Sequence, residues 1–382
     1  MKRGRFSFQL LKQGGEQGRL GLITTPHGQF STPAFMPVGS QGSVKALAPA
    51  DLQEVGTEIL LCNAYHLYLR PGTEVVKEVG GLHRFMGWQG PILTDSGGFQ
   101  IVSMSALRDV ESEGVRFRSH IDGSLHFLTP AKVVQIQEEL GSDIMMVLDS
   151  CPPYPASPDE AKAAVALTTE WARQSKGAKG ETGQALFGIV QGGVYPELRR
   201  QSANELVEIG FDGYAIGGLS LGEAKEATFE IAEQVTDLLP EDFPRYLMGM
   251  GTPEDILRGV RIGVDMFDCV LPTRGARTGL LFTSLGPLNI KQARYSADAA
   301  PPDPACDCYT CCNFSRAYLR HLFLSRELLA YRLNAVHNLF YYHSLVRGIR
   351  QALSEDTMDQ FVRAFFSQRE DTTGSEGGET VC

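Results

Sequence analysis

One stretch of the chain combines residue types and spacing that suggest chemistry directly. Residues 263–277 contain a run of strand-forming residues that carries Asp268, stops at Pro272 and continues into Arg274 and Arg277. This run predicts a buried strand that delivers a carboxylate beside a cationic loop. A carboxylate in such a place suits work next to phosphate groups, which arginines bind.

Polar or glycine-rich segments also follow several other apolar runs. At any one of them a tight turn or a helix cap is the simpler explanation. The set as a whole favours a functional site, because capping requires neither three aspartates nor a glutamine at a strand end. The segments are 95–100, 149–151, 191–193, 217–219 and 248–251, together with Asp268.

Two of these carboxylates, Asp95 and Asp268, suit displacement at a sugar carbon. One attacks to form a glycosyl ester, and the other moves protons to and from the leaving and entering groups. Asp149 and Gln191 add an acceptor and a mixed donor and acceptor, which can read the edge of a flat heterocycle. Phe99 lies beside two glycines and can stack on such a ring, although a lone Phe is more often a core residue.

A cluster of cysteines near residue 310 indicates a metal site. Cys306, Cys308 and Cys311 are followed 26 residues after the last of them by His337, and four such ligands complete a closed zinc tetrahedron. The expected role is therefore structural. Competing ligand candidates are Cys312, which follows Cys311 too closely to share an ion without strain, and His321 and His343, which are more often ordinary helix-surface residues.

Eight short apolar runs, each followed by a helix-like segment, must position these groups. The alternation predicts parallel βαβ units, and eight strands close a (β/α)8 TIM barrel of the α/β class, in which the loops after the strands converge on one face. An open doubly wound sheet is the alternative, although it would not so naturally use eight strands. The runs are 33–38, 59–65, 92–95, 144–149, 186–191, 214–218, 246–249 and 266–270.

The elements around the strands are also readable. Thr129, Ser157 and Thr252 each precede a proline and predict helix N-termini. Residues 115–128 alternate around an Asp-Gly turn and predict an inserted β-hairpin. Residues 1–32 resemble a lid over one end, with a hairpin through 18–22, and helical stretches are expected at 314–334 and 338–353.

The composition bounds the class of protein. A chain of 382 residues with 43% hydrophobic residues can bury a large core, and its net charge of −10 requires a local basic patch for any polyanion. The candidates for this patch are Arg274, Arg277, Lys291 and Arg294, with Arg316, Arg320 and Arg326 in the zinc region. No apolar run reaches the length of a membrane span, which predicts a cytoplasmic protein without a membrane partner. The expected domains are a barrel with its lid (1–300), a zinc-binding helical subdomain packed on it (301–366) and a disordered tail (367–382).

The segments 95–100, 188–193, 213–219 and 267–274, with the cysteine cluster and its histidine, together resemble the queuine tRNA-ribosyltransferases, also called tRNA-guanine transglycosylases, and most closely the bacterial form. The resemblance runs from about Phe6 to about Phe366. It implies a pentosyltransferase that exchanges guanine at the tRNA wobble position for a 7-deazaguanine precursor, a step in queuosine biosynthesis.

The same resemblance implies residue roles. Asp268 would be the nucleophile on the ribose and Asp95 the general acid and base. Phe99, where the family often has tyrosine, and Met248 would sandwich the base. The remaining roles would be base binding by Ser96, Asp149, Gln191 and the backbone of Gly218 and Leu219, anticodon-loop contacts by Arg274 and Arg277, and binding of one structural zinc ion per subunit by Cys306, Cys308, Cys311 and His337.

Substrates and partners also follow from the resemblance. They are tRNAs with GUN anticodons, guanine, and 7-aminomethyl-7-deazaguanine (preQ1). Leu221 is a bulky residue just beyond the Gly-Gly-Leu segment and should exclude the cyclopentenediol of queuine. Family members are commonly homodimers. Two other functions compete with this interpretation: a non-catalytic tRNA-binding subunit, against which both aspartates argue, and a zinc hydrolase built on a barrel.

Overall fold

The computed structural model describes residues 5–13, 18–104 and 108–373, and the chain divides into two compact units. The first unit comprises residues up to 43 and residues 58–268, and the second comprises residues 44–57 and the chain from 269 onward. The three domains expected from the sequence, 1–300, 301–366 and 367–382, stay a prediction.

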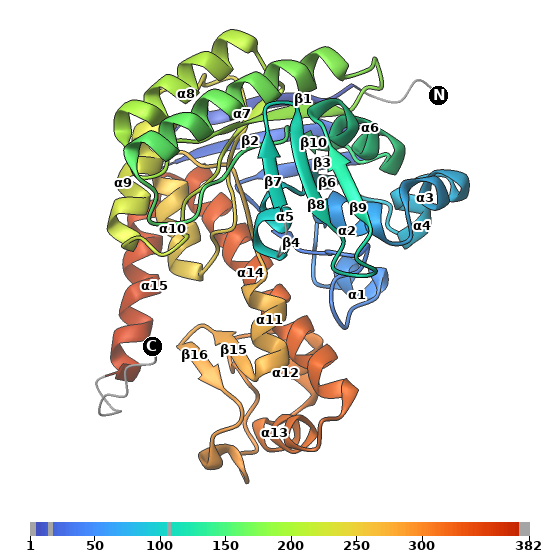
Figure 1. The fold of residues 1–382 in the computed structure, drawn as a ribbon. Coiled ribbons are helices and arrows are strands. Elements are labelled where there is room, and N and C mark those ends of the chain that lie inside the picture. The colour runs from blue at the N-terminus through green and yellow to red at the C-terminus, as the bar shows by residue number, and fades with distance from the viewer. Residues whose placement is uncertain (1–4, 14–17, 105–107, 374–382) are drawn as a thin grey trace. The chain divides into compact units, whose positions relative to one another are not determined.

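The first unit contains a closed sheet of eight parallel strands, which confirms the TIM barrel (Figure 1). The two end strands of the sheet order, β4 and β5, are joined by a parallel bridge between Val38 and Leu61 and by the hydrogen bond from Gly39 N to Leu61 O at 2.7 Å. Each of the eight predicted runs forms one strand. In sheet order they are β4 (Ala34–Pro37), β14 (Met266–Cys269), β13 (Arg245–Leu247), β12 (Gly213–Ile216), β11 (Ala185–Val190), β10 (Ile144–Met146), β6 (Ile92–Asp95) and β5 (Leu60–Asn63).

Helices follow the strands, and the predicted caps begin three of them. The hydroxyl of Thr129 accepts from Lys132 N, and Ser157 and Thr252 form full capping boxes with Glu160 and Asp255. These caps satisfy donors that the first helical turn leaves without partners. The helices of this unit are α2 (Ala64–Leu69), α3 (Thr73–Val79), α4 (Leu82–Met86), α5 (Gly98–Met104), α6 (Pro130–Leu140), α7 (Pro158–Ala178), α8 (Pro196–Ile209), α9 (Lys225–Thr236) and α10 (Pro253–Arg261).

Two small antiparallel sheets complete the first unit. The predicted hairpin is present as β8 (Gly114–Arg118) and β9 (Leu125–Leu128), and a further strand, β7 (Arg108–Glu111), pairs with β8. At the N-terminus β1 (Ser7–Gln13), β2 (Arg19–Thr25) and β3 (Gly28–Thr32) form a sheet in which residues 19–22 belong to a strand and not to a turn.

The N-terminal sheet is tied to the starting ends of barrel strands. Arg19 forms an ion pair with Asp265 at 3.0 Å, and His27 meets Asp143 at 2.8 Å. Each aspartate directly precedes a barrel strand, β14 or β10. The sheet therefore contacts the barrel at the end opposite to the loops that follow the strands.

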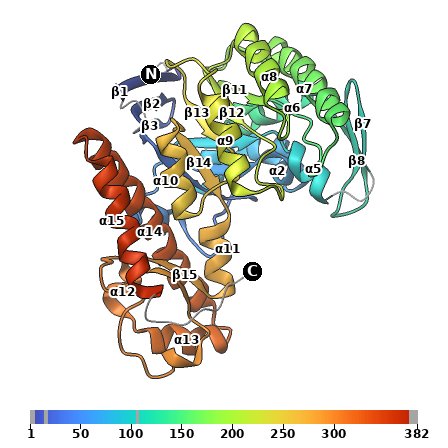
Figure 2. The ribbon, with the colours of Figure 1, turned by 90° about the vertical axis from the view of Figure 1, so that its left-hand side faces the viewer.

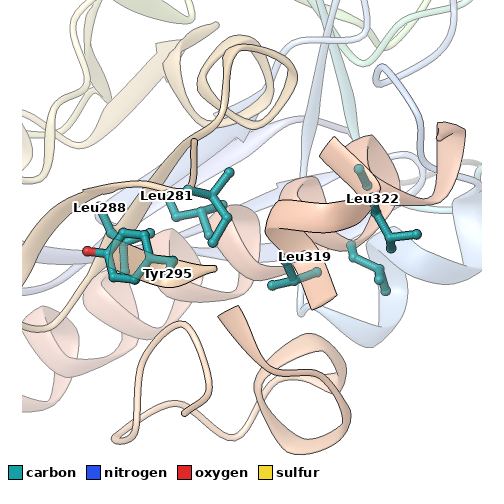
Figure 3. Close-up of a cluster of buried hydrophobic side chains, with 8 residues drawn as sticks. Leu281, Leu288, Tyr295, Leu319 and Leu322 are labelled. Atoms are coloured by element: carbon teal, nitrogen blue, oxygen red, sulfur yellow. The ribbon is translucent and has the colours of Figure 1, made fainter. Parts of the chain in front are cut away.

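The second unit is mostly helical and has its own apolar core. Leu281, Leu288, Tyr295, Leu319 and Leu322 pack together in it (Figure 3), and α14 and α15 run side by side (Figure 2). Its elements are α1 (Pro49–Glu54), α11 (Leu271–Thr278), β15 (Leu280–Thr283), β16 (Gly286–Asn289), the 3-10 helix η2 (Ala293–Tyr295), α12 (Tyr309–Asn313), α13 (Arg316–Leu324), α14 (Leu328–Ser354) and α15 (Met358–Thr373).

Two expectations for this unit were wrong in detail. The segment with Arg274 and Arg277 is the helix α11 and not a loop, because Pro272 occupies its first turn, where a missing N–H costs nothing. The long C-terminal helices break at residues 325–327, where Arg326 has φ 57°, and not at 335–337. Residues 367–373 belong to α15, and the remainder of the expected tail, 374–382, lies outside the described residues.

Within the described residues, no helix combines the length and the apolar character that a membrane span requires.

Candidate functional site

The loop end of the barrel gathers most of the predicted site residues. Asp95 and Asp268 lie on β6 and β14, and Asp149, Gln191 and Met248 follow β10, β11 and β13. Parallel strands present their C-terminal ends to the same face, so these side chains approach one another although they are far apart in the sequence. The whole group belongs to the first unit.

Asp268 is held by two donors. Its Oδ1 accepts the hydroxyl of Tyr246 at 2.6 Å and the backbone N–H of Gly249 at 2.7 Å. Burial raises the pKa of Asp268, and these two donors lower it in part. Because both donors bind one oxygen, the carboxylate is fixed in orientation while Oδ2 accepts no hydrogen bond from the described residues.

Asp95 is buried, with 7% of its surface exposed. Its oxygens accept the side-chain amide of Asn63 and the backbone N–H of Ala64, the latter at 2.9 Å. Burial and, to a smaller extent, the charge of Asp268 together raise the pKa of Asp95 to about 7 against the effect of these donors. A carboxyl group with such a pKa can both give and take a proton near neutral pH.

Asp149 connects two further site residues. Its Oδ1 accepts from Ser96 Oγ at 3.3 Å, and its Oδ2 accepts from Gln191 Nε2 at 2.7 Å. Burial raises the pKa of Asp149, while both donors lower it. The Oε1 atom of Gln191 is buried and has no partner among the described residues, so it can accept a hydrogen bond from a bound molecule.

The Gly-Gly-Leu segment passes directly beside Gln191. Gly218 has φ 64°, and a Cβ there would lie 2.2 Å from Gln191 Oε1, so only glycine fits. Met248 is part of the same group, since its sulfur lies 3.5 Å from where a Cβ of Gly217 would stand. Leu219 is buried, whereas the ring of Phe99 at the start of α5 is half exposed.

The two predicted RNA-contacting arginines belong to the second unit. Arg274 and Arg277 lie on α11, and both are exposed. Arg277 donates to the carbonyl of Thr273 at 3.1 Å, which is a bond within its own helix.

The predicted metal ligands come together in the second unit. Nδ1 of His337 lies 3.8, 3.6 and 3.2 Å from the sulfurs of Cys306, Cys308 and Cys311. His337 Nε2 donates to the carbonyl of Phe282 at 2.9 Å, which directs the lone pair of Nδ1 toward the sulfurs. These four residues could hold a metal ion. Neither His343, which bonds to Thr57, nor Cys312 belongs to the group.

A second set with metal-site composition lies at the opposite end of the barrel. Nδ1 of His27 is 2.8 Å from Asp143 Oδ1, and Nε2 of His83 is 3.0 Å from Asp143 Oδ2. The two imidazoles stack face to face, with centroids 3.5 Å apart and planes 18° apart. One ligand atom from each of the three residues lies within 4.8 Å of the others. Each imidazole already meets its own oxygen of Asp143, so we interpret the set as a hydrogen-bonded latch.

Sequence reasoning did not single out the groups that orient the two aspartates. Asn63 ends β5, and Tyr246 lies inside β13. Asn63 could have been noticed as a polar residue at a strand end, because it pairs with Asp95, a predicted site residue at the end of the next strand. Tyr246 gave no signal, because an aromatic residue in an apolar run is typical of a core strand.

Comparisons with known proteins agree with this geometry. The family model described as queuine tRNA-ribosyltransferase matches residues 14–371. The chain is 54% identical over 370 residues to a queuine tRNA-ribosyltransferase of Caldanaerobacter subterraneus subsp. tengcongensis, covering 95% of this chain and 99% of the relative. It is 57% identical over 349 residues to one of Nitratidesulfovibrio vulgaris, covering 91% and 93%. The chain therefore belongs to the queuine tRNA-ribosyltransferase family.

Proposed function

We propose that this protein exchanges guanine at the wobble position of tRNA for preQ1 through a covalent ester between Asp268 and the ribose. The single observation that carries the proposal is the pairing of two unlike carboxyl groups at one barrel end. Asp268 is held by Tyr246 and Gly249, while Asp95 has its pKa raised by burial to about 7. Environments that separate the roles of two carboxyl groups are typical of acid and nucleophile pairs.

The reaction would proceed as two displacements at one carbon. An oxygen of Asp268 bonds to C1′ as the bond from C1′ to N9 of guanine breaks, and the electron pair leaves with the base. Asp95 gives its proton to the departing guanine. It then takes a proton from preQ1, whose ring nitrogen displaces Asp268. Two inversions retain the configuration at C1′, and the RNA backbone stays intact.

The base must leave its stack in the anticodon loop before this chemistry. Turning out a nucleotide costs a few kcal/mol, and the cost is least in single strands. Asp149, Gln191, Ser96 and the backbone of Gly218 and Leu219 would bind the edge of the everted base. The unpartnered Oε1 of Gln191 supports this assignment, because a base N–H would satisfy it. Phe99 and Met248 would stack on its two faces.

The preference for preQ1 rests on a small pocket beside Gln191 and Gly218. Leu221 and Glu223 line it. Burial raises the pKa of Glu223, but its hydrogen bonds from Thr228 and the loop backbone outweigh burial and lower the pKa below its usual value. An ionised Glu223 suits the aminomethyl cation of preQ1, and Leu221 limits the space that the larger queuine needs. Efficient incorporation of queuine and not preQ1 would overturn this preference.

The remaining proposals concern partners and the metal. Arg274 and Arg277 would contact the anticodon loop of tRNAs with GUN anticodons, and the enzyme would act as a homodimer. Zinc is the ion that three thiolates and one imidazole select, and such a closed site stabilises the fold around it. Cys306, Cys308, Cys311 and His337 would bind it.

The direct test is exchange by the purified chain alone. Radiolabelled guanine and labelled preQ1 are each incubated with a GUN-anticodon tRNA and with a control tRNA of another anticodon. Incorporation into the first tRNA only is expected. No incorporation without a second subunit would favour the non-catalytic partner role, for which both aspartates are unnecessary.

The variant Asp95→Ala should still bind tRNA but lose exchange. Near-normal exchange by this variant would contradict the proposed role of Asp95 as general acid and base.

A further inference from the structure

The structure contains a buried arginine directly beneath the Gly-Gly-Leu segment. Arg199 lies in the first turn of α8 and is only 1% exposed. Its hydrogen bonds all go to main-chain carbonyl oxygens and none to a carboxylate. Nε donates to Gly193 at 2.8 Å, Nη1 to Val190 at 2.9 Å and to Gly217 at 2.7 Å, and Nη2 to Gly218 at 3.2 Å.

A buried cation without a paired anion needs a physical reason. Taking a guanidinium out of water is costly, and most proteins compensate by placing a carboxylate beside it. Burial here lowers the pKa of Arg199 to about 10, so the side chain stays charged near neutral pH. Glu223 lies near enough to interact with it electrostatically, but its carboxylate binds the backbone N–H groups of Ser220 and Leu221.

The bonds of Arg199 act on two particular peptide units. The carbonyl of Gly217 shares its peptide unit with the N–H of Gly218, and the carbonyl of Gly218 shares its unit with the N–H of Leu219. A cation bound to a carbonyl oxygen polarises the whole unit and makes its N–H a stronger donor. Among the described residues, neither of these two N–H groups donates to a protein acceptor.

We propose that Arg199 is a positioning residue that fixes and polarises the Gly217–Gly218 and Gly218–Leu219 peptide units, so that their N–H groups stabilise negative charge on the carbonyl oxygen of the departing base. The inference deepens the proposed function and rests on it. When C1′ bonds to Asp268 and separates from N9, the electron pair spreads over the base to its carbonyl oxygen. Donors that strengthen as this charge develops lower the barrier more than they favour substrate binding.

Three variants separate this role from simple pocket support. Arg199→Gln removes the charge, Arg199→Lys keeps the charge but not the fork of donors, and Arg200→Gln is the matched control. Arg200 is the next residue on the same helix, it is exposed, and it pairs with Glu197 at 2.8 Å. Each variant is checked for folding by its thermal midpoint and for tRNA binding by filter retention.

The main readout is the split between kcat and KM in guanine exchange. Arg199→Gln is expected to lower kcat at least about tenfold with a smaller change in KM, Arg199→Lys should fall between it and the wild type, and Arg200→Gln should match the wild type. The loss in Arg199→Gln should also be smaller with 8-azaguanine as leaving base than with guanine, because a more acidic base needs less stabilisation. Equal losses for both bases, or a change in KM alone, would overturn the proposal.

A measurement on the unmodified enzyme keeps the proposal testable if both Arg199 variants fail to fold. Bound 8-azaguanine should show the ultraviolet spectrum of its anion at a pH where the free base is neutral, since polarised donors favour the charged form. A neutral spectrum would contradict the inference. Failure of the proposed function is distinguishable, because then the wild-type chain would not exchange guanine at all.

Discussion

Tyr246 donates its hydroxyl to Oδ1 of Asp268 at 2.6 Å, and this bond links two neighbouring barrel strands at the point where the nucleophile is proposed to act. The bond stabilises the ionised carboxylate and restricts its rotation. The hydrogen bond from Tyr246 therefore influences both the ionisation and the orientation of the Asp268 carboxylate.

Replacing Tyr246 by Phe should raise the pKa of Asp268 further above its usual value, because a donor to the charged form is lost. The acid limb of the pH profile of kcat/KM for tRNA should move to higher pH, while the alkaline limb stays in place. Tyr214→Phe is the matched control, since in the part of the chain that the structure describes the Tyr214 hydroxyl has one hydrogen bond, which it accepts from Phe211 N at 3.4 Å. An unchanged acid limb would exclude the bond from a role in ionisation.

The alkaline limb should reflect Asp95. Its pKa is raised to about 7, first by burial and then by the charge of Asp268. For a group whose folded pKa lies above its unfolded value, the free energy of unfolding falls as pH rises from about 4 to about 7. The proposed first displacement needs the protonated form of Asp95, so kcat/KM for tRNA should decline above pH 7.

The coupling between the two aspartates can be measured without turnover. Asp268→Asn should lower the pKa of Asp95, because one like charge is removed. Carbon-13 NMR of labelled aspartate carboxyl groups would report the change, with Asp149→Asn as the control. If Asp95 titrates identically in Asp268→Asn and wild type, the two groups do not interact as described.

The latch at the opposite barrel end predicts an acid-dependent stability. Burial raises the pKa of Asp143, but hydrogen bonds from His27 and His83 outweigh it and hold the pKa at about 2. A carboxyl group whose pKa is lower in the folded than in the unfolded protein stabilises the fold at pH values above its unfolded pKa. This contribution to the free energy of unfolding is lost as the pH falls from about 4 to about 2. Asp143→Asn should cost about 2 kcal/mol at pH 7 and less at pH 2.5, by urea unfolding.

The control for this experiment is Asp212→Asn. Asp212 also precedes a barrel strand and accepts a neighbouring strand's N–H, from Leu186 at 2.8 Å, but within the described part of the chain no histidine donates to it. A pH-independent difference between Asp143→Asn and wild type would mean that only the backbone bonds of Asp143 contribute.

Metal removal should affect the second unit. Chelation, or Cys311→Ser, should release one zinc ion per chain and lower the thermal midpoint. The reason is that the free energy of metal binding to the folded state adds to the free energy of unfolding. Cys312→Ser is the matched control, since Cys312 is exposed and lies outside the four-residue group. Metal loss in Cys312→Ser with retention in Cys311→Ser would contradict the ligand assignment.

The barrel strands and three helix starts could be predicted because their signals are local. Strands buried on both faces, such as β10 and β11, are continuous apolar runs, and Thr129 and Ser157 are followed by proline at a helix start. Pro272 is compatible with two local structures, the end of a strand and the first turn of a helix, and the sequence alone does not distinguish them.

Other features depend on contacts between residues distant in sequence. The proposed role of Arg199 depends on carbonyl groups at the ends of two different strands, which a helix pattern does not reveal. The same holds for Tyr246 and for the bonds of His27 and His83 to Asp143. Residue types at strand ends predict which groups meet, but not which neighbours orient them.

Trapping the glycosyl ester tests the central claim most directly. Wild-type enzyme mixed with tRNA without a free base, then denatured and separated on a denaturing gel, should give a protein–RNA adduct whose mass spectrum places the ribose on Asp268. Asp268→Asn should give none, while Tyr246→Phe should give a reduced amount. A denaturant-stable adduct formed by Asp268→Asn, or a wild-type adduct on another residue, would contradict the account.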